Sequence, residues 1–188
     1  MTESVAALAS QACAEIAATF RTIDETEVAE LVEAIAGARR IVLHGVGREG
    51  LMMRALTMRL FHMGLDAHPA GDMTTPAIGP GDLLVVSAGP GEFATVNALM
   101  GVAKAAGARV AVVTAQPGGG AARAADLTMC LPAQTMANDS GPAASAVLSM
   151  GSAFEGAQYV FFEVLVLLLR QRLGIGADDM RARHTNLE

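Results

Sequence analysis

Residues 41–50 read Ile-Val-Leu-His-Gly-Val-Gly-Arg-Glu-Gly, and this stretch decides the fold. An apolar, β-favouring run ends in closely spaced glycines and is followed by a long segment rich in Met, Leu and Arg. This order is typical of a strand, a tight turn and a helix, which together open an α/β unit. Gly45 and Gly47 allow the backbone to turn sharply where a side chain would clash. We therefore predict a strand over residues 41–44 and a helix over residues 48–63.

The turn after this strand points the first amide groups of the predicted helix into a crevice, where they favour anionic or polar ligand groups. The alternative, with about even odds, is that a glycine turn after a strand is only a turn and binds no ligand. Gly45, Gly47 and Gly50 also match the spacing G-x-G-x-x-G, which by itself is weak evidence for a dinucleotide. The next predicted strand is short and does not end in the acidic residue that would bind a ribose. We therefore predict no NAD and no other cofactor.

Short apolar strands alternate with helices along the rest of the chain. Further strands are predicted over residues 66–69, 83–86, 109–114 and 127–131, and further helices over residues 93–106 and 151–173. Continuously apolar strands that alternate with helices indicate a parallel sheet covered on both faces. We predict an α/β three-layer sandwich with a five-stranded parallel sheet of flavodoxin-like strand order, in which residues 41–44 form a central strand.

The length of 188 residues predicts a single domain over residues 1–188. Two helices are predicted within residues 1–38, and residues 174–188 form a C-terminal tail. Apolar residues make up 52% of the chain and charged residues 17%, so the surface is sparsely charged for a monomer. This composition predicts a homo-oligomer, either a dimer or a tetramer. The net charge of −6 argues against a nucleic-acid partner.

Membrane and metal binding are also not indicated. The longest apolar run, residues 164–169, is too short to span a bilayer, and the N-terminal region lacks the basic segment of a signal peptide. Cys13 and Cys130 lie far apart and without metal-ligand spacing, which predicts reduced, buried thiols. We therefore expect a cytoplasmic protein without a metal site.

Two predicted helix starts carry the spacing of a capping box, in which the first and fourth residues satisfy each other's backbone amides. Asp24 and Glu27 have this spacing at the start of the second N-terminal helix. Ser152 and Glu155 have it at the start of the long helix over residues 151–173. The pattern indicates a capping role for Glu27, and for Glu155 capping is the ordinary alternative to a functional role.

A second glycine loop follows the third predicted strand and reads Ser87-Ala88-Gly89-Pro90-Gly91-Glu92. Both glycine loops lie at the carboxyl ends of parallel strands, where ligands bind in sheets of this kind. A polar loop over residues 71–76 adds the neighbouring hydroxyl groups of Thr74 and Thr75. These loops are the candidate ligand-binding segments.

Several motifs taken together resemble the sugar isomerase (SIS) domain family. They are the arginine-bearing first loop, Thr-Thr-Pro-Ala-Ile-Gly-Pro-Gly-Asp at 74–82, Gly-x-x-Phe-Glu at 151–155, and Arg-His-x-Asn-Leu-Glu at 183–188. Within the family the chain is most similar to the 6-phospho-3-hexuloisomerases, and the likeness covers nearly the whole chain. The resemblance implies an enzyme that moves a carbonyl between adjacent carbons of a ketohexose phosphate through an enediol. It also implies catalysis without a metal and tetramers built from dimers.

By this resemblance Glu155 corresponds to the catalytic carboxylate, and His184 to a histidine that acts in the site of a neighbouring subunit. A carboxylate can carry a proton between adjacent carbons, while a histidine exchanges protons with the oxygens. The ordinary alternatives are helix capping for Glu155 and a solvent-exposed tail for His184. The implied substrate-binding residues are Gly45, Gly47, Arg48, Glu49, Thr74, Thr75, Ser87, Gly89, Gly91 and Glu92.

Three positions depart from the family pattern where phosphate would bind. The family usually has serine at the position of Glu49, a second serine at that of Pro90, and threonine at that of Phe93. Two like charges a few ångströms apart repel by on the order of 1–4 kcal/mol in wet surroundings, so a carboxylate at position 49 would oppose a phosphate. The alternative function is therefore an SIS-fold protein that binds or isomerises a non-phosphorylated sugar derivative, with Glu49 accepting hydroxyl or amine hydrogens. If Glu49 faces solvent, this argument fails. A non-catalytic regulatory domain is a third, less supported alternative.

Overall fold

The computed structural model describes residues 4–141, 144–145 and 147–187, and it contains the predicted parallel sheet. The strands are β1 (Ile41–His44), β2 (Ala67–Pro69), β3 (Leu83–Ser87), β4 (Arg109–Thr114) and β5 (Leu127–Cys130). All neighbouring strands are parallel, and their order is β2-β1-β3-β4-β5. The flavodoxin-like order is confirmed. β1 is an interior strand, as predicted, although β3 is the middle strand of the five.

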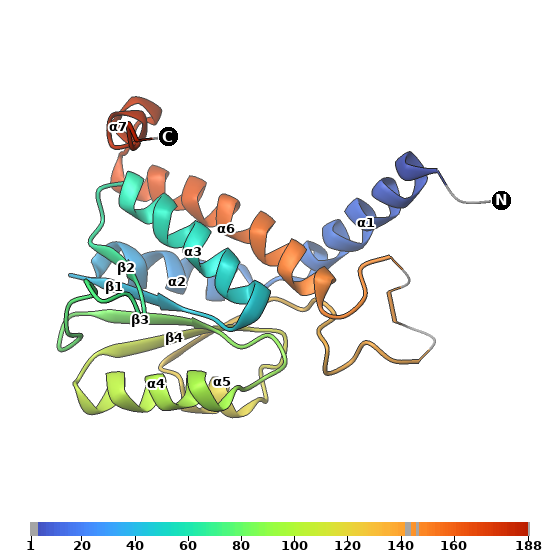
Figure 1. The fold of residues 1–188 in the computed structure, drawn as a ribbon, viewed down its shortest axis with the longest axis horizontal. Coiled ribbons are helices and arrows are strands. Elements are labelled where there is room, and N and C mark those ends of the chain that lie inside the picture. The colour runs from blue at the N-terminus through green and yellow to red at the C-terminus, as the bar shows by residue number, and fades with distance from the viewer. Residues whose placement is uncertain (1–3, 142–143, 146, 188) are drawn as a thin grey trace.

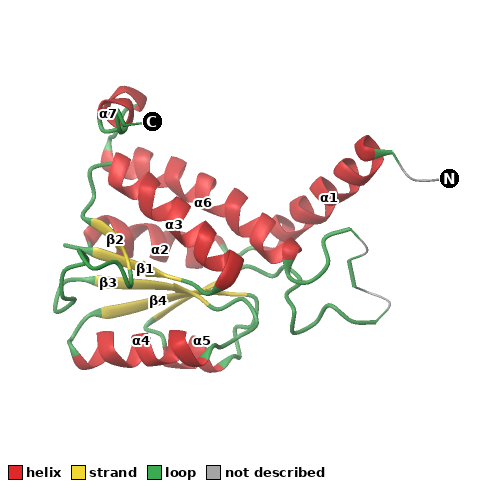
Figure 2. Cartoon of the chain, in the orientation of Figure 1, coloured by secondary structure: helices red, strands yellow, loops and turns green. Residues whose placement is uncertain are grey.

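The helices cover both faces of this sheet. They are α1 (Val5–Thr19), α2 (Glu25–Gly37), α3 (Gly47–His62), α4 (Ala94–Ala105), α5 (Gly120–Ala124), α6 (Ser152–Leu173) and α7 (Ala177–Ala182), with a 3₁₀ turn η1 (Phe20–Thr22). In Figures 1 and 2, α2, α3 and α6 lie on one face and α4 and α5 on the other, which confirms the three layers. The tail contains α7, an element that was not predicted. Thr2, Glu3 and Glu188, which the predicted helix and tail include, lie outside the described residues.

The strands are buried on both faces, which explains their continuous apolar sequences. Val85 of β3 belongs to the core beneath α2, α3 and α6, whereas Leu84 and Val86 belong to the core beneath α4. This division follows from the strand pleat, which sends successive side chains to opposite faces. Phe161 and Leu165 of α6 are almost completely buried in the first core, so α6 is held firmly over the sheet.

The turn between β1 and α3 depends on its glycines. Gly47 has a φ of 58°, a left-handed conformation that glycine adopts without strain. A Cβ atom on Gly50 would lie 2.6 Å from the carbonyl oxygen of Gly45, so the first helical turn packs directly on the backbone of the loop. The predicted tight turn is confirmed, and it places the start of α3 against the carboxyl end of β1.

The capping box predicted for α2 is only half correct. Asp24 does cap the helix, since its side chain accepts a hydrogen bond of 2.8 Å from the amide of Thr26. Glu27, however, accepts a hydrogen bond of 2.6 Å from the amide of Cys130 and thereby ties α2 to the end of β5. The prediction of two buried thiols is wrong for Cys13, which is exposed, while Cys130 is partly buried.

The unbroken apolar run 164–169 is only part of a longer apolar helix, so its short length does not settle whether the chain could span a membrane. Among the described residues, α6 is a helix long and apolar enough to cross a membrane by length and composition alone. Half of its most apolar window is buried inside the molecule, and it packs on α1, α2 and α3, as the core helix of a globular domain does.

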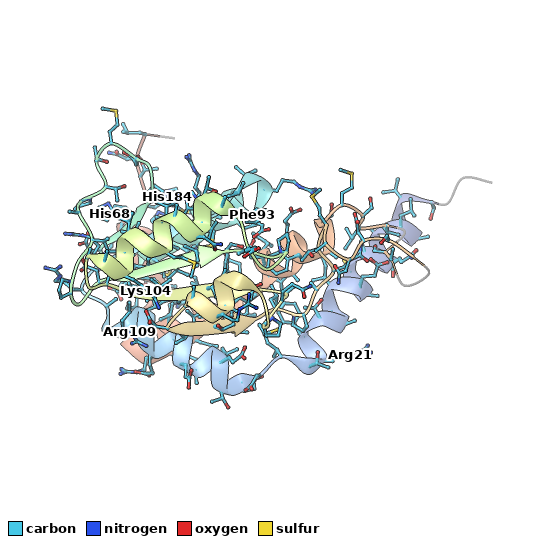
Figure 3. All side chains as sticks on the ribbon, turned by 90° about the horizontal axis from the view of Figure 1, so that it is seen from below. Arg21, His68, Phe93, Lys104, Arg109 and His184 are labelled. Carbon is cyan, nitrogen blue, oxygen red and sulfur yellow. The ribbon has the colours of Figure 1, made fainter. Side chains whose placement is uncertain are left out.

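Basic side chains are scattered: Figure 3 shows Arg21 well apart from Lys104 and Arg109.

Candidate active site

A pocket of about 640 Å³, here called the main pocket, opens where the start of α3, the loop after β3 and the start of α6 meet. Its volume suits a small organic molecule. Arg48 and Glu49 contribute from α3, Pro90 and Phe93 from the second glycine loop, and Glu155 from α6. The pocket therefore lies at the carboxyl edge of the sheet, and both glycine loops contribute to it.

Arg48 holds Glu155 in this pocket. The Nε atom of Arg48 lies 3.0 Å from Oε2 of Glu155, while its other nitrogens donate to the Ser152 hydroxyl at 2.9 Å and to the Met150 carbonyl at 2.5 Å. The Nε contact lacks hydrogen-bond geometry, since Oε2 of Glu155 has no hydrogen-bond partner among the described residues. Burial raises the pKa of Glu155, and the positive charge of Arg48 partly opposes this rise.

The capping box predicted from Ser152 and Glu155 is wrong. The residue that precedes α6 is Gly151, with a left-handed φ of 83°, and no side chain caps the helix there. Ser152 instead receives a hydrogen bond from Arg48, and Glu155 forms an ion pair with the same arginine. The structural alternative proposed for Glu155 is thereby removed, and its carboxylate is available to a ligand in the pocket.

Glu49 turns into the protein and not toward solvent, with only 6% of its surface exposed. Its Oε2 atom accepts a short hydrogen bond from the Ser87 hydroxyl and another of 3.0 Å from the Gly89 amide. Burial raises the pKa of Glu49; the hydrogen bonds from Ser87 and Gly89 oppose the rise, and the nearby charge of Glu155 adds to it. Arg48, its neighbour in the sequence, does not pair with Glu49 but with Glu155.

Gln158 contacts Ser87, the hydrogen-bond donor to Glu49, and was missed in the sequence. It is fully buried, and its side-chain amide donates a hydrogen bond of 2.8 Å to the oxygen of Ser87. Ser87 thus accepts from Gln158 and directs its own proton to Glu49. The signal in the sequence was a polar residue about one helical turn beyond Glu155.

Several residues predicted to bind substrate have other contacts in this chain. The Thr74 hydroxyl donates to Asp72 at 2.8 Å, and the Thr75 hydroxyl donates to the carbonyl of Pro69 at 2.6 Å. Both bonds shape the loop after β2. Gly45 lines a second, smaller pocket of about 300 Å³, whereas Gly47 lines both this pocket and the main pocket.

In and next to the second glycine loop, some residues also line the main pocket while others contact different segments. Pro90 and Phe93 line the main pocket, whereas the exposed Glu92 packs against Gly120 at the start of α5. Gly89 lies directly behind the pocket wall: a Cβ there would be 2.8 Å from the Phe154 ring and 2.9 Å from Oε1 of Glu49. Gly91, with a φ of 108°, packs on the loop that precedes α5. Phe154, Met136 and Met150 form an apolar wall of the pocket; the two methionines carried no recognisable motif in the sequence.

His184 does not lie in the main pocket of its own chain. Its ring stacks on His62 with a centroid distance of 5.0 Å, at the C-terminal end of α3. The pocket lies at the other end of this helix, roughly 22 Å away at a rise of about 1.5 Å per residue. Figure 1 shows α7 and the C-terminus at one end of the α3–α6 pair and the start of α6 at the other. Within one chain, the structure therefore does not bring the two predicted catalytic residues together.

Comparison with known proteins shows the family to which the chain belongs. The family model of the SIS domain matches residues 34–157, about two thirds of the chain, and the chain therefore belongs to the SIS domain family. It is 39% identical over 174 residues to the 3-hexulose-6-phosphate isomerase of Mycobacterium gastri, which covers 93% of this chain and 86% of that protein. It is 31% identical to the 3-hexulose-6-phosphate isomerase of Bacillus subtilis strain 168, over 88% of this chain and 89% of that one.

A solved structure agrees with these relatives. A hypothetical protein from Methanococcus jannaschii superposes with a TM-score of 0.80 at 28% identity, over 96% of this chain and 97% of that one. For that protein a molecular function of 3-hexulose-6-phosphate isomerase was inferred from its crystal structure. The resemblance predicted from the sequence is confirmed.

Proposed function

We propose that this protein is a sugar isomerase of the 6-phospho-3-hexuloisomerase type. It moves a carbonyl between adjacent carbons of a ketohexose or its phosphate, through an enediol. The observation that carries the proposal is a carboxylate, Glu155, set in a largely apolar pocket and oriented by Arg48. The names of the relatives support the same reaction class, since the proteins from Mycobacterium gastri and Bacillus subtilis are 3-hexulose-6-phosphate isomerases.

The reaction needs one base that first removes a proton from carbon and later returns a proton to the neighbouring carbon. Glu155 removes the proton from the carbon that bears a hydroxyl next to the carbonyl, and an enediol forms when the carbonyl oxygen gains a proton. The hydroxyl oxygen then loses its proton, and Glu155 returns a proton to the former carbonyl carbon. One C–H bond and one O–H bond are broken and one of each is formed, so the step requires no oxidant, no reductant and no metal.

His184 of a neighbouring subunit is the proposed group that exchanges protons with the two oxygens. Its distance from the main pocket of its own chain requires a second subunit, so the active protein is a homo-oligomer whose C-terminal tails cross between subunits. Exposed apolar side chains on α3 and α6 support such an assembly: about half of each of Phe61, Tyr159 and Leu167 is accessible to solvent. The two free cysteines, Cys13 and Cys130, support a cytoplasmic location.

The direct test is conversion between two ketohexose phosphates, followed by NMR, with the native protein and Glu155→Gln. The amide keeps the shape of the side chain but is not a base, so we expect the rate to fall by about 10²–10⁴-fold. Glu163→Gln is the matched control, because Glu163 lies on the same helix and pairs with Arg59 of α3 at 3.3 Å. Equal rates for Glu155→Gln and Glu163→Gln would reject Glu155 as the base.

A further inference from the structure

We infer that the substrate group bound beside Glu49 is a hydrogen-bond donor without negative charge, a hydroxyl or an amine, and not a phosphate. The inference rests on the proposed function, because it names the substrate class of the same pocket. It concerns the corner of the pocket between the start of α3 and the loop after β3.

The donors that an anion would need at this corner are already occupied. The hydroxyl of Ser87 and the backbone amide of Gly89 both donate to Oε2 of Glu49. The side-chain amide of Gln158 donates a hydrogen bond to the Ser87 oxygen, which fixes the direction in which that hydroxyl donates. The carboxylate of Glu49 thus takes the place that a bound anion would occupy at the N-terminal end of α3.

The charge of the pocket also excludes an anion. Among the described residues that line it, Glu49 and Glu155 are carboxylates and Arg48 is the single cation. Arg48 already contacts Glu155, the hydroxyl of Ser152 and the carbonyl of Met150. From this chain alone, a phosphate dianion would meet two carboxylates and one arginine that is already paired, whereas an amine or hydroxyl would be attracted.

The remaining oxygen of Glu49 provides the acceptor for such a donor. Both hydrogen bonds from the described residues go to Oε2, which leaves Oε1 for the ligand. Phe154 packs against the same corner, and Pro90 and Phe93 add apolar wall in place of further donors. A hydrogen bond from a hydroxyl or amine to a carboxylate oxygen is electrostatically stronger in apolar surroundings than in water.

The test is calorimetric titration of the native protein, Glu49→Ser and Glu49→Gln with fructose 6-phosphate, D-fructose and D-glucosamine. We expect the native protein to bind fructose or glucosamine more tightly than fructose 6-phosphate. Removal of the charge should raise the affinity for fructose 6-phosphate by at least about tenfold in either Glu49 variant. Glu163→Ser is the matched control: it removes the same charge from α6 outside the main pocket, and should leave all three affinities unchanged.

The two sugars distinguish the two donors, since only glucosamine presents an amine. The inference is overturned if the native protein binds fructose 6-phosphate more tightly than fructose, or if neither Glu49 variant gains affinity for the phosphate. Glu49→Gln guards against misfolding, because its amide oxygen can still accept from Ser87 and Gly89.

Turnover measurements separate this inference from the proposed function. If the native protein isomerises a hexulose phosphate more efficiently than the free hexulose, the isomerase proposal stands and the inference fails. If Glu49 proves to select neutral or cationic sugars but no ketohexose is isomerised, the inference stands and the isomerase proposal fails.

Discussion

Glu49 is the residue whose ionisation most directly affects stability. Its pKa is raised by burial, so its carboxyl binds a proton more readily in the folded than in the unfolded chain. Such a group stabilises the fold when protonated, and this contribution is lost as the pH rises through the folded-state pKa. At neutral pH the charged form is therefore a cost, and Glu49→Gln should increase the free energy of unfolding.

Chemical denaturation of the native protein and Glu49→Gln at pH 7 and at pH 4 measures this effect. The stability advantage of the variant should be largest at pH 7 and should shrink toward pH 4, where the glutamate is itself becoming neutral. An advantage that is absent at pH 7, or that grows on acidification, would show that the hydrogen bonds from Ser87 and Gly89 outweigh the burial of charge.

The pH dependence of turnover reports on Glu155. The base must be ionised, and its pKa lies above the ordinary value of 4.5 because of burial. We expect turnover to fall as the pH is lowered, with the acid limb above the pH at which an exposed glutamate would titrate. Arg48→Gln removes the opposing positive charge and should move this limb to still higher pH. A limb that does not move would mean that Arg48 only positions the carboxylate.

At the scale of single residues, the sequence indicated which side chains carry functional chemistry better than it indicated what those side chains contact. Glu155 and Glu49 were both recognised, because a carboxylate beside a glycine loop or at a helix start is a visible signal. Thr74 and Thr75 look equally promising in the sequence, yet their hydroxyls bond to their own loop. Gln158 was missed because its partner Ser87 lies 71 residues away in the sequence and meets it only in the folded chain.

At the scale of elements, the contact of the β1–α3 turn with its own helix determines where Glu49 lies. Gly50→Ala would bring a Cβ within 2.6 Å of the Gly45 carbonyl, and because that atom belongs to the backbone the contact is hard to relieve. We expect a loss of about 1–3 kcal/mol in unfolding free energy, which is typical of overpacking, together with weaker ligand binding.

Gly101→Ala in α4 is the control for this prediction. Gly101 is exposed, lies in the middle of a helix, and has no atom within 4 Å of the position of an added Cβ. This substitution should stabilise the protein by roughly 0.5–1 kcal/mol, as alanine does in an open helix position. Thermal denaturation of both variants would contradict the account if their order of stability were reversed.

The elements themselves were largely predictable, because strands buried on both faces and glycine turns leave strong local patterns. Local patterns failed where tertiary contacts compete. Glu27 has the spacing of a capping residue but reaches the amide of Cys130, and Ser152 receives Arg48 instead of capping α6. No local signal distinguishes a side chain that caps its own helix from one that bonds to a distant strand.

At the scale of the whole molecule, the central prediction is that His184 and Glu155 of one active site come from different subunits. Glu155→Gln and His184→Asn should each be inactive alone. When the two variants are unfolded and reassembled together, mixed oligomers contain some sites with both native residues, so part of the activity should return. No recovery in verified mixed oligomers would contradict the shared site.

Assembly into an oligomer stays a prediction, and the sequence supports it only in outline. The apolar content of 52% indicated an oligomer, but the sequence could not show which surfaces are exposed in a single chain. The structure identifies them as the outer sides of α3 and α6, with Met58, Phe61 and Tyr159 accessible. Removal of residues 180–188 should therefore reduce activity and weaken the oligomer together, as measured by light scattering. A shortened chain that keeps both would reject the role of the tail.

The measurement that tests the account most directly is isomerisation in D₂O, followed by NMR of the product. A proton carried by Glu155 through an enediol exchanges with solvent, so the account predicts deuterium on the carbon that held the carbonyl. The rate in Glu155→Gln should be lower by at least about 10²-fold. Complete retention of the original hydrogen in the product, or an undiminished rate in Glu155→Gln, would contradict the account.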